Sequence, residues 1–159
     1  MNTTILIIGI VLVAAFVIPM AIINNHGKSK KLKDKKLIED IGQVHNLIIS
    51  SSSIFHHMIL AHDNTNHKLA YIVNGNATII DLLSTTNARI EKSYQEANQK
   101  LIDKIHLVIN TKKDTISILF YDNELRNKLD LHEQNDNANE WLQRIETSRT
   151  SRVKEPALA

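Results

Sequence analysis

The chain has 159 residues, of which 43% are hydrophobic, 23% charged and 4% aromatic, and it contains no cysteine. This length accommodates one ordinary domain with an appendage. The lack of cysteine excludes a disulfide scaffold, a thiolate zinc site and a cysteine nucleophile. The net charge of +2 is unevenly distributed, because residues 28–36 hold six lysines and one aspartate while residues 37–159 are slightly acidic. A nucleic-acid-binding domain would carry a basic face of its own, so this distribution argues against that function.

Thr4–Ile23 is a run of twenty residues without a charged side chain. A helix of that length spans about 30 Å, the thickness of the hydrocarbon core of a bilayer. A cleaved signal peptide would have a basic start, a shorter apolar stretch and a small-residue cleavage site, and this segment departs from all three. We therefore expect residues 1–27 to form an uncleaved, single-pass transmembrane anchor with a short external N-terminus.

The lysines after the apolar run predict the orientation of this anchor. Short flanks rich in Lys and Arg stay on the cytoplasmic side, so we expect the N-terminus outside and residues 28–159 in the cytoplasm. Near the membrane surface each lysine can also contribute about 1 kcal/mol of attraction to anionic headgroups. The candidate lipid-headgroup residues are Lys28, Lys30, Lys31, Lys33, Lys35 and Lys36. The alternative is that these lysines serve as a topology signal alone.

Residues 28–53 are expected to form a basic juxtamembrane segment with an amphipathic helix. Apolar residues recur at three- and four-residue spacing from Lys31 to about Ser50, which predicts a helix. The run Ser50–Ser53 then predicts a break.

Short strand-like segments bounded by turn residues follow from residue 54. An early hairpin is predicted around the turn Asn74-Gly75-Asn76, and a late one around Lys112-Lys113-Asp114. A polar loop, His62–His67, precedes the early hairpin. The expected strands are Ile54–His62, Lys68–Asn74, Ala77–Leu83, Ile105–Thr111, Thr115–Tyr121 and a shorter one at Lys128–Leu131.

The segment Asn87–Lys104 has two interpretations. Apolar residues from Ile90 to Ile105 are spaced by three and four, which favours a helix. The alternative is a pair of strands, Ile90–Tyr94 and Leu101–Ile109, joined by a polar loop. Local pattern alone slightly favours the helix.

The last predicted element is an amphipathic helix. Asn137, with Glu140 three residues later, is a plausible N-cap pair. Ala138, Trp141, Leu142 and Ile145 form one apolar face, and the large Trp141 ring is expected to fill the core. Thr147–Ala159 has no apolar periodicity, and residues 148–159 are expected to be a disordered tail.

This order of elements resembles membrane-anchored bacterial proteins with a small pleckstrin-homology-like domain. The residues that carry the resemblance are the hairpins KLAYIVNGNATIID and IHLVINTKKDTISILFYD and the helix NANEWLQRI. The resemblance implies an α+β, mainly β domain over residues 54–147, an antiparallel barrel of about seven strands capped by a C-terminal helix. It favours the strand interpretation of Asn87–Lys104. The family is best known for binding phosphoinositides through basic residues at the first hairpin loop, but His62–Lys68 lacks that basic pattern, so no lipid-binding residue is carried over.

No constellation predicts catalysis, a cofactor or a metal. The histidines His56, His57, His62 and His67 are the strongest metal candidates, but adjacent strand residues face opposite ways, so structural histidines explain them better. No phosphate loop, nucleophile elbow or metalloprotease helix is present. We therefore expect no enzyme, but a membrane-anchored interaction module, an adaptor or scaffold that binds protein. The alternatives are a reader of anionic lipid headgroups and an accessory subunit of a membrane complex.

Overall fold

The computed structural model describes residues 32–55, 58–96, 98–125 and 129–151, and the chain divides into two units, Met1–Gln43 and Val44–Ala159. The expected transmembrane segment Thr4–Ile23 lies outside the described residues. Among the helices that are described, none has the length and apolar character needed to cross a bilayer.

The helix predicted from Lys31 to about Ser50 is shorter than expected. It covers residues 32–44 and is followed by a turn and an extended stretch, so its expected continuation to Ser50 is wrong. Asn46 has a φ of 51°, and a residue in this left-handed conformation is a common way for a helix to end. Val44 and Ile48, which extended the apolar spacing, are exposed side chains.

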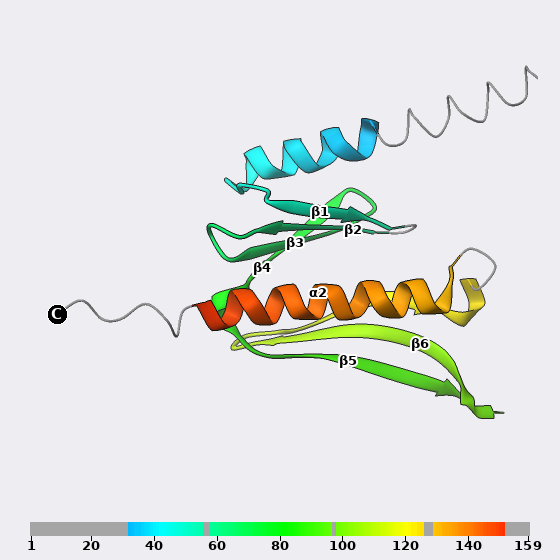
Figure 1. Cartoon of the computed structure of the whole chain (residues 1–159). Coiled ribbons are helices and arrows are strands. Elements are labelled where there is room, and N and C mark those ends of the chain that lie inside the picture. The colour runs from blue at the N-terminus through cyan, green and yellow to red at the C-terminus, as the bar shows by residue number, and fades with distance from the viewer. Residues whose placement is uncertain (1–31, 56–57, 97, 126–128, 152–159) are drawn as a thin grey trace, which may run out of the picture. The chain divides into compact units, whose positions relative to one another are not determined.

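The first sheet contains four antiparallel strands in the order β1-β2-β3-β4 (Figure 1). Their bounds are Ser51–Ile54, Ile59–Asp63, Lys68–Val73 and Asn76–Asp81. Two predictions are therefore wrong here. The serine run forms β1 instead of a break, and the expected strand Ile54–His62 covers the end of β1, a connection and most of β2. Serine has little preference of its own for strands, and strand formation depends on neighbouring strands. Here Ser51 pairs with His62 and Ile54 with Ile59, so pairing with β2 makes this segment a strand.

The early hairpin is confirmed. β3 and β4 pair from Lys68 with Asp81 to Val73 with Asn76. Asn74 and Gly75 form the turn with φ values of 51° and 81°. Two positive φ values in a two-residue loop match the twist of a hairpin, which is why asparagine followed by glycine predicted it.

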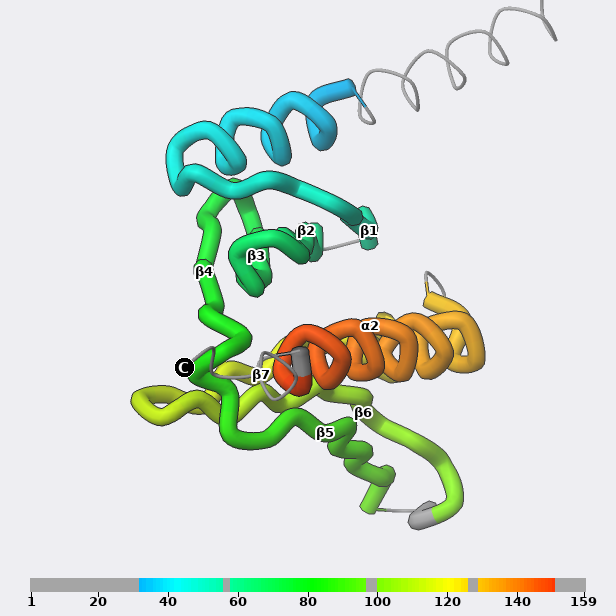
Figure 2. The backbone as a smooth tube through the Cα atoms, turned by 60° about the vertical axis from the view of Figure 1, so that its left-hand side comes forward, coloured from blue at the N-terminus to red at the C-terminus, as the bar shows by residue number. Residues whose placement is uncertain are grey.

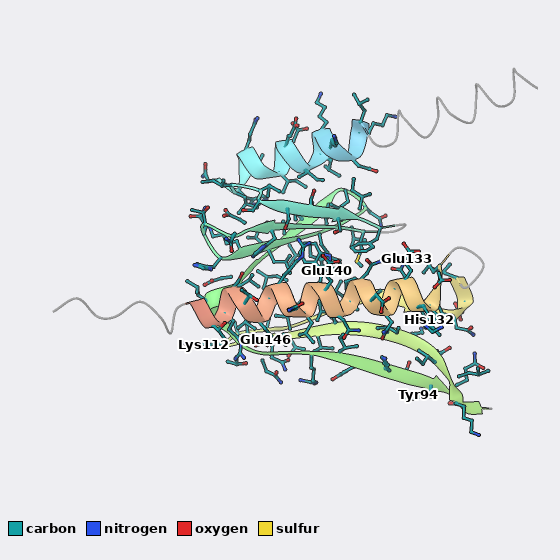
Figure 3. The ribbon with its side chains drawn as sticks, in the orientation of Figure 1. Tyr94, Lys112, His132, Glu133, Glu140 and Glu146 are labelled. Carbon is teal, nitrogen blue, oxygen red and sulfur yellow. The ribbon has the colours of Figure 1, made fainter. Side chains whose placement is uncertain are left out.

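The second sheet contains β5 (Thr85–Gln95), β6 (Asn98–Thr111) and β7 (Thr115–Asp122), in the order β5-β6-β7. A 3-10 turn, η1 (Leu82–Ser84), precedes it, and another, η2 (Asn123–Leu125), follows it. The strand interpretation of Asn87–Lys104 and the late hairpin are confirmed. The helical spacing misled because Tyr94 and Leu101 are half-exposed. Tyr94 lies near the end of the β5–β6 hairpin (Figure 3), where register shifts interrupt the alternation.

The terminal helix α2 (Leu131–Ser151) is longer than predicted at both ends. Its cap is Asp130, whose Oδ1 accepts a hydrogen bond from the Glu133 backbone N–H at 3.0 Å, so the expected cap at Asn137 is wrong. The expected strand Lys128–Leu131 is also wrong at its described residues, because residues 129–130 are irregular and Leu131 begins α2. The predicted tail from Thr147 is helical through Ser151, and residues 152–159 lie outside the described residues.

Within Val44–Ala159, α2 lies between the two sheets, and the chain passes from β4 of the first sheet through η1 to β5 of the second (Figures 1 and 2). One buried cluster joins both sheets to the apolar face of α2, including Leu60, Leu69, Leu107, Phe120 and Trp141. The predicted burial of Trp141 is confirmed, with 1% of the residue exposed. The unit is an α+β domain of antiparallel strands with a C-terminal helix, as the sequence predicted. The described strands form two separate sheets packed against that helix, whereas the expectation was a single barrel.

Candidate functional site

A polar groove lies between the β1–β2 side of the first sheet and the C-terminal half of α2. It encloses about 420 Å³. We call it the β1–α2 groove. The strand side contributes Ser50, Ser51, His62 and Asn64, and the helix side contributes Glu140, Gln143, Arg144, Thr147 and Ser148.

The spacing of the α2 residues explains why they share the groove. Glu140, Arg144 and Ser148 are four positions apart, and so are Gln143 and Thr147, which places these two neighbouring rows on one face of a helix. The neighbouring face, with Ala138, Trp141 and Ile145, is buried in the core. Burial of that apolar face therefore fixes the direction in which the polar face points.

Arg144 connects the two sides of the groove. Its Nη1 donates a 2.7 Å hydrogen bond to the Ser51 Oγ, and its Nη2 donates to the Glu140 carboxylate one turn earlier. The guanidinium carbon also lies 5.1 Å from the centre of the Trp141 ring, within the range of a cation–π contact. These three partners hold a planar cation at the groove in one orientation.

His62 is a buried polar residue on the strand side of the groove. Its Nε2 lies 2.9 Å from the Ser148 Oγ, and the residues are 7% and 1% exposed. Burial lowers the pKa of His62 below its ordinary value, and the charge of Arg144 lowers it further, while Asp63 opposes this change. His62 is therefore neutral at physiological pH.

Asp63 fixes the loop after β2. One carboxylate oxygen accepts hydrogen bonds from the backbone N–H groups of Thr65 and Asn66, and the other accepts from the Ile48 N–H and the Asn66 amide. Burial disfavours the charged form, but the hydrogen bonds from Asn66, Ile48 and Thr65 outweigh it and lower the pKa of Asp63. The Ser50 Oγ also accepts from the Asn64 N–H at 3.1 Å. The strand side of the groove is thus held by a buried carboxylate.

The structure places part of the predicted lysine cluster. Lys33, Lys35 and Lys36 are exposed on the helix of residues 32–44, while Lys28, Lys30 and Lys31 lie outside the described residues. Lys33 and Lys36 lie on one side of that helix, but Lys35 is turned about 200° from Lys33 at 3.6 residues per turn. The three described lysines therefore lie within about 160° of the circumference of the helix, with Lys36 between Lys35 and Lys33.

The predicted histidine group is not brought together as a metal site in the described part of the chain. His56 and His57 lie outside it, and His62 is bonded to Ser148. Where residues are described, no three His, Asp or Glu side chains are grouped to hold a metal ion.

Sequence reasoning missed Arg144, Ser148 and Ser51 as site residues. The predicted helix stopped near Thr147, so Ser148 fell in the tail, and Ser51 fell in a predicted break. The available signal was the polar series Glu140, Arg144 and Ser148 at exact four-residue spacing beside an apolar face.

The groove's side chains suit binding better than catalysis. A serine nucleophile needs an accessible Oγ, a base and a group that orients the base, whereas the Ser148 residue is 1% exposed and the Glu140 carboxylate is bonded to Arg144. Most of the lining residues carry a hydroxyl, amide or guanidinium group at the end of the side chain, and such groups recognise polar or anionic ligands. The chain matches no known family model, no curated protein and no solved structure.

Proposed function

We propose that the chain is a single-pass membrane-anchored adaptor or scaffold whose cytosolic domain binds a protein partner through the β1–α2 groove. The observation that carries this proposal is the polar groove, about 420 Å³, with a fixed arginine between an edge strand and a helix. The apolar run Thr4–Ile23 and the lysines after it support the anchor and its orientation.

The fold supports the same proposal. Sheets of four and three antiparallel strands closed by a terminal helix are the arrangement expected of a pleckstrin-homology-like domain, and we propose that the domain is of this type. Folds of this kind host many functions, so the proposal depends on the groove and not on the fold.

The position of β1 explains how a peptide would be held. β1 pairs with β2 and stands at the end of its sheet in the described part of the chain. An extended peptide can add to such an edge through backbone hydrogen bonds, with side chains recognised by the neighbouring groove. The anchor would keep the domain beside the bilayer and raise its effective concentration for membrane-bound partners.

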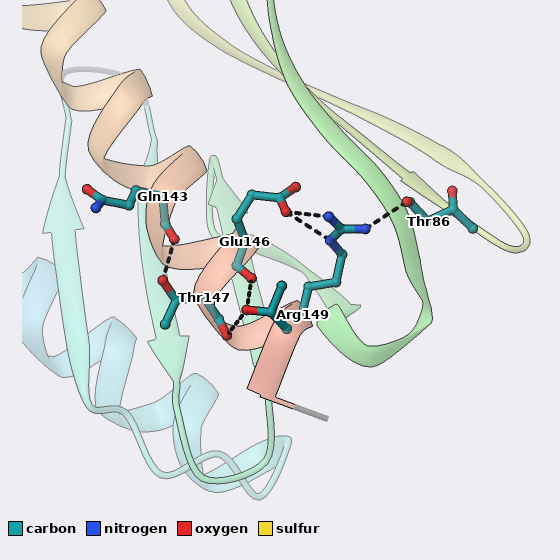
Figure 4. A network of polar contacts seen from close by, with 6 residues as sticks. Thr86, Gln143, Glu146, Thr147 and Arg149 are labelled. Carbon is teal, nitrogen blue, oxygen red and sulfur yellow. Dashed lines mark hydrogen bonds and ion pairs between the residues drawn. The ribbon is translucent and has the colours of Figure 1, made fainter. Parts of the chain in front are cut away.

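The test is crosslinked affinity capture of the full-length, C-terminally tagged chain from membranes. The informative variant is Arg144→Gln, and the matched control is Arg149→Gln on the same helix. Arg149 bonds to Glu146 and to the Thr86 carbonyl of β5, away from Gln143 (Figure 4).

We expect the original chain and the Arg149→Gln variant to capture the same partner, and the Arg144→Gln variant to lose it. Equal capture by all three chains would contradict docking at the groove. Capture of the same partner by the anchor without the folded domain would contradict the adaptor function itself.

A further inference from the structure

The hydrogen-bond donors of the β1–α2 groove include one cation, the guanidinium group of Arg144. Arg144 presents five N–H groups in a planar fork, and its Nη1 and Nη2 each make one hydrogen bond within the protein. Ser51 accepts the bond from Nη1, so its own hydroxyl hydrogen can be donated to a ligand. Charge-assisted bonds from such a fork match the spacing of carboxylate and phosphate oxygens.

Glu140 is the single acid among the lining residues that the structure describes. Its carboxylate receives a bond from the Arg144 Nη2, while 57% of its side chain is exposed. It lies on the side of α2 toward the first sheet (Figure 3). An ion pair this exposed contributes little to stability, because water screens the two charges. The Glu140 carboxylate can therefore leave Arg144 at little cost when another anion arrives.

His62 responds to the charge in the groove. Burial and the charge of Arg144 hold the pKa of His62 low, so the Arg144–Glu140 ion pair lies in the same groove as an imidazole whose neutral form is favoured. An anion bound at Arg144 would offset part of the positive charge that disfavours protonated His62. Binding of an anion would consequently raise the pKa of His62.

We infer that the β1–α2 groove is an oxyanion site that receives a carboxylate or phosphate group of the partner protein, with Glu140 occupying Arg144 until that group displaces it. This inference rests on the proposed function and adds the chemical class of the ligand. It distinguishes two roles for the ion pairs of α2. Arg144–Glu140 is an exchangeable pair at a binding site, whereas Arg149–Glu146 is a structural pair that holds the helix to β5.

The first experiment titrates the full chain in detergent micelles with inorganic phosphate, using sodium chloride at matched ionic strength as the reference. The readouts are the NMR signals of the His62 ring and the Gln143 side-chain amide. We expect saturable shifts with phosphate, an upward change in the His62 pKa, and affinity about tenfold or more weaker in Arg144→Gln. Arg149→Gln should bind as the original chain does. Equal shifts with chloride, or equal affinity in both arginine variants, would overturn the site.

The second experiment tests displacement of the internal carboxylate. Glu140→Gln removes the competing anion, so phosphate should bind about two- to fivefold more tightly. Glu146→Gln, which releases Arg149 instead, should leave phosphate affinity unchanged. Weaker binding in Glu140→Gln, or the same gain in both variants, would contradict the role given to Glu140.

The two proposals fail in distinguishable ways. Partner capture that depends on Arg144, without phosphate binding, would keep the adaptor function and overturn the oxyanion site. Phosphate binding that depends on Arg144, without partner capture, would overturn the adaptor function and the protein source of the oxyanion together, leaving a small-anion site.

Discussion

Asp63 offers the sharpest test of the structural argument. Each of its two oxygens accepts two hydrogen bonds, at 2.7–2.9 Å, and the residue is 0% exposed. Asp63→Asn replaces one oxygen by an NH₂ group, which faces two donors instead of accepting from them. Leaving a partly buried donor without its acceptor costs about 1–3 kcal/mol. Two such losses, partly relieved by water, predict that the variant is less stable by about 2–4 kcal/mol.

The assay is urea unfolding of the full chain in detergent micelles, followed by the fluorescence of Trp141, the single tryptophan. Asp81→Asn is the matched control, because Asp81 is exposed and accepts one backbone bond, from Leu83. That variant should lose less than about 1 kcal/mol. Equal losses in the two variants would refute the argument that burial and bond number set the stability.

The stability difference between the original chain and Asp63→Asn should also depend on pH. The folded-state pKa of Asp63 is lowered, so its contribution is complete above the unfolded value, about 3.9, and is lost as the pH falls toward the folded value. A difference that stays constant from pH 7 to pH 3 would contradict the ionised state assigned to this carboxyl.

Four further predictions concern His62, Trp141, Gly75 and the six lysines of residues 28–36. The folded-state pKa of His62 is lowered, so stability should fall as the pH drops below about 6.5; thermal unfolding between pH 8 and pH 5 should show a slope that His62→Gln removes. Trp141→Ala should cost about 3–5 kcal/mol, measured by the circular dichroism of urea unfolding. Gly75→Ala should cost about 1–2 kcal/mol in the same assay, because its φ of 81° strains any side chain although nothing lies within 4 Å, and a change below about 0.3 kcal/mol would contradict this. Replacing the six lysines of residues 28–36 by glutamine should reduce the fraction of chains with a cytosolic C-terminus, which a protease-protection assay measures; unchanged orientation would contradict the topology proposal.

Elements with local signals were predictable from the sequence. Asn74 followed by Gly75 is typical of a two-residue hairpin loop, in which both residues have a positive φ. The alternation of Ile116, Ile118 and Phe120 predicted β7. The apolar face around Trp141 predicted the middle of α2 for the same reason, since helical spacing alone brings those residues together.

Elements that depend on distant partners were not predictable. The serines of β1 become a strand because β2 supplies their hydrogen bonds. The last turn of α2 contains the 1%-exposed Ser148, and its partner His62 is 86 positions away. The β1–α2 groove combines these two elements, so its residues could be recognised only after both had been placed.

The most direct test of the binding role of the groove is site-specific photo-crosslinking in membranes. One chain carries a photoreactive amino acid in place of Gln143, which lines the groove, and the matched chain carries it in place of Asn137, a position of α2 outside the groove lining. We predict a discrete crosslinked protein from the Gln143 position that is absent at Asn137 and lost when Arg144→Gln is added. The same products from both positions, or a Gln143 product that persists with Arg144→Gln, would contradict the proposal that this groove binds the partner.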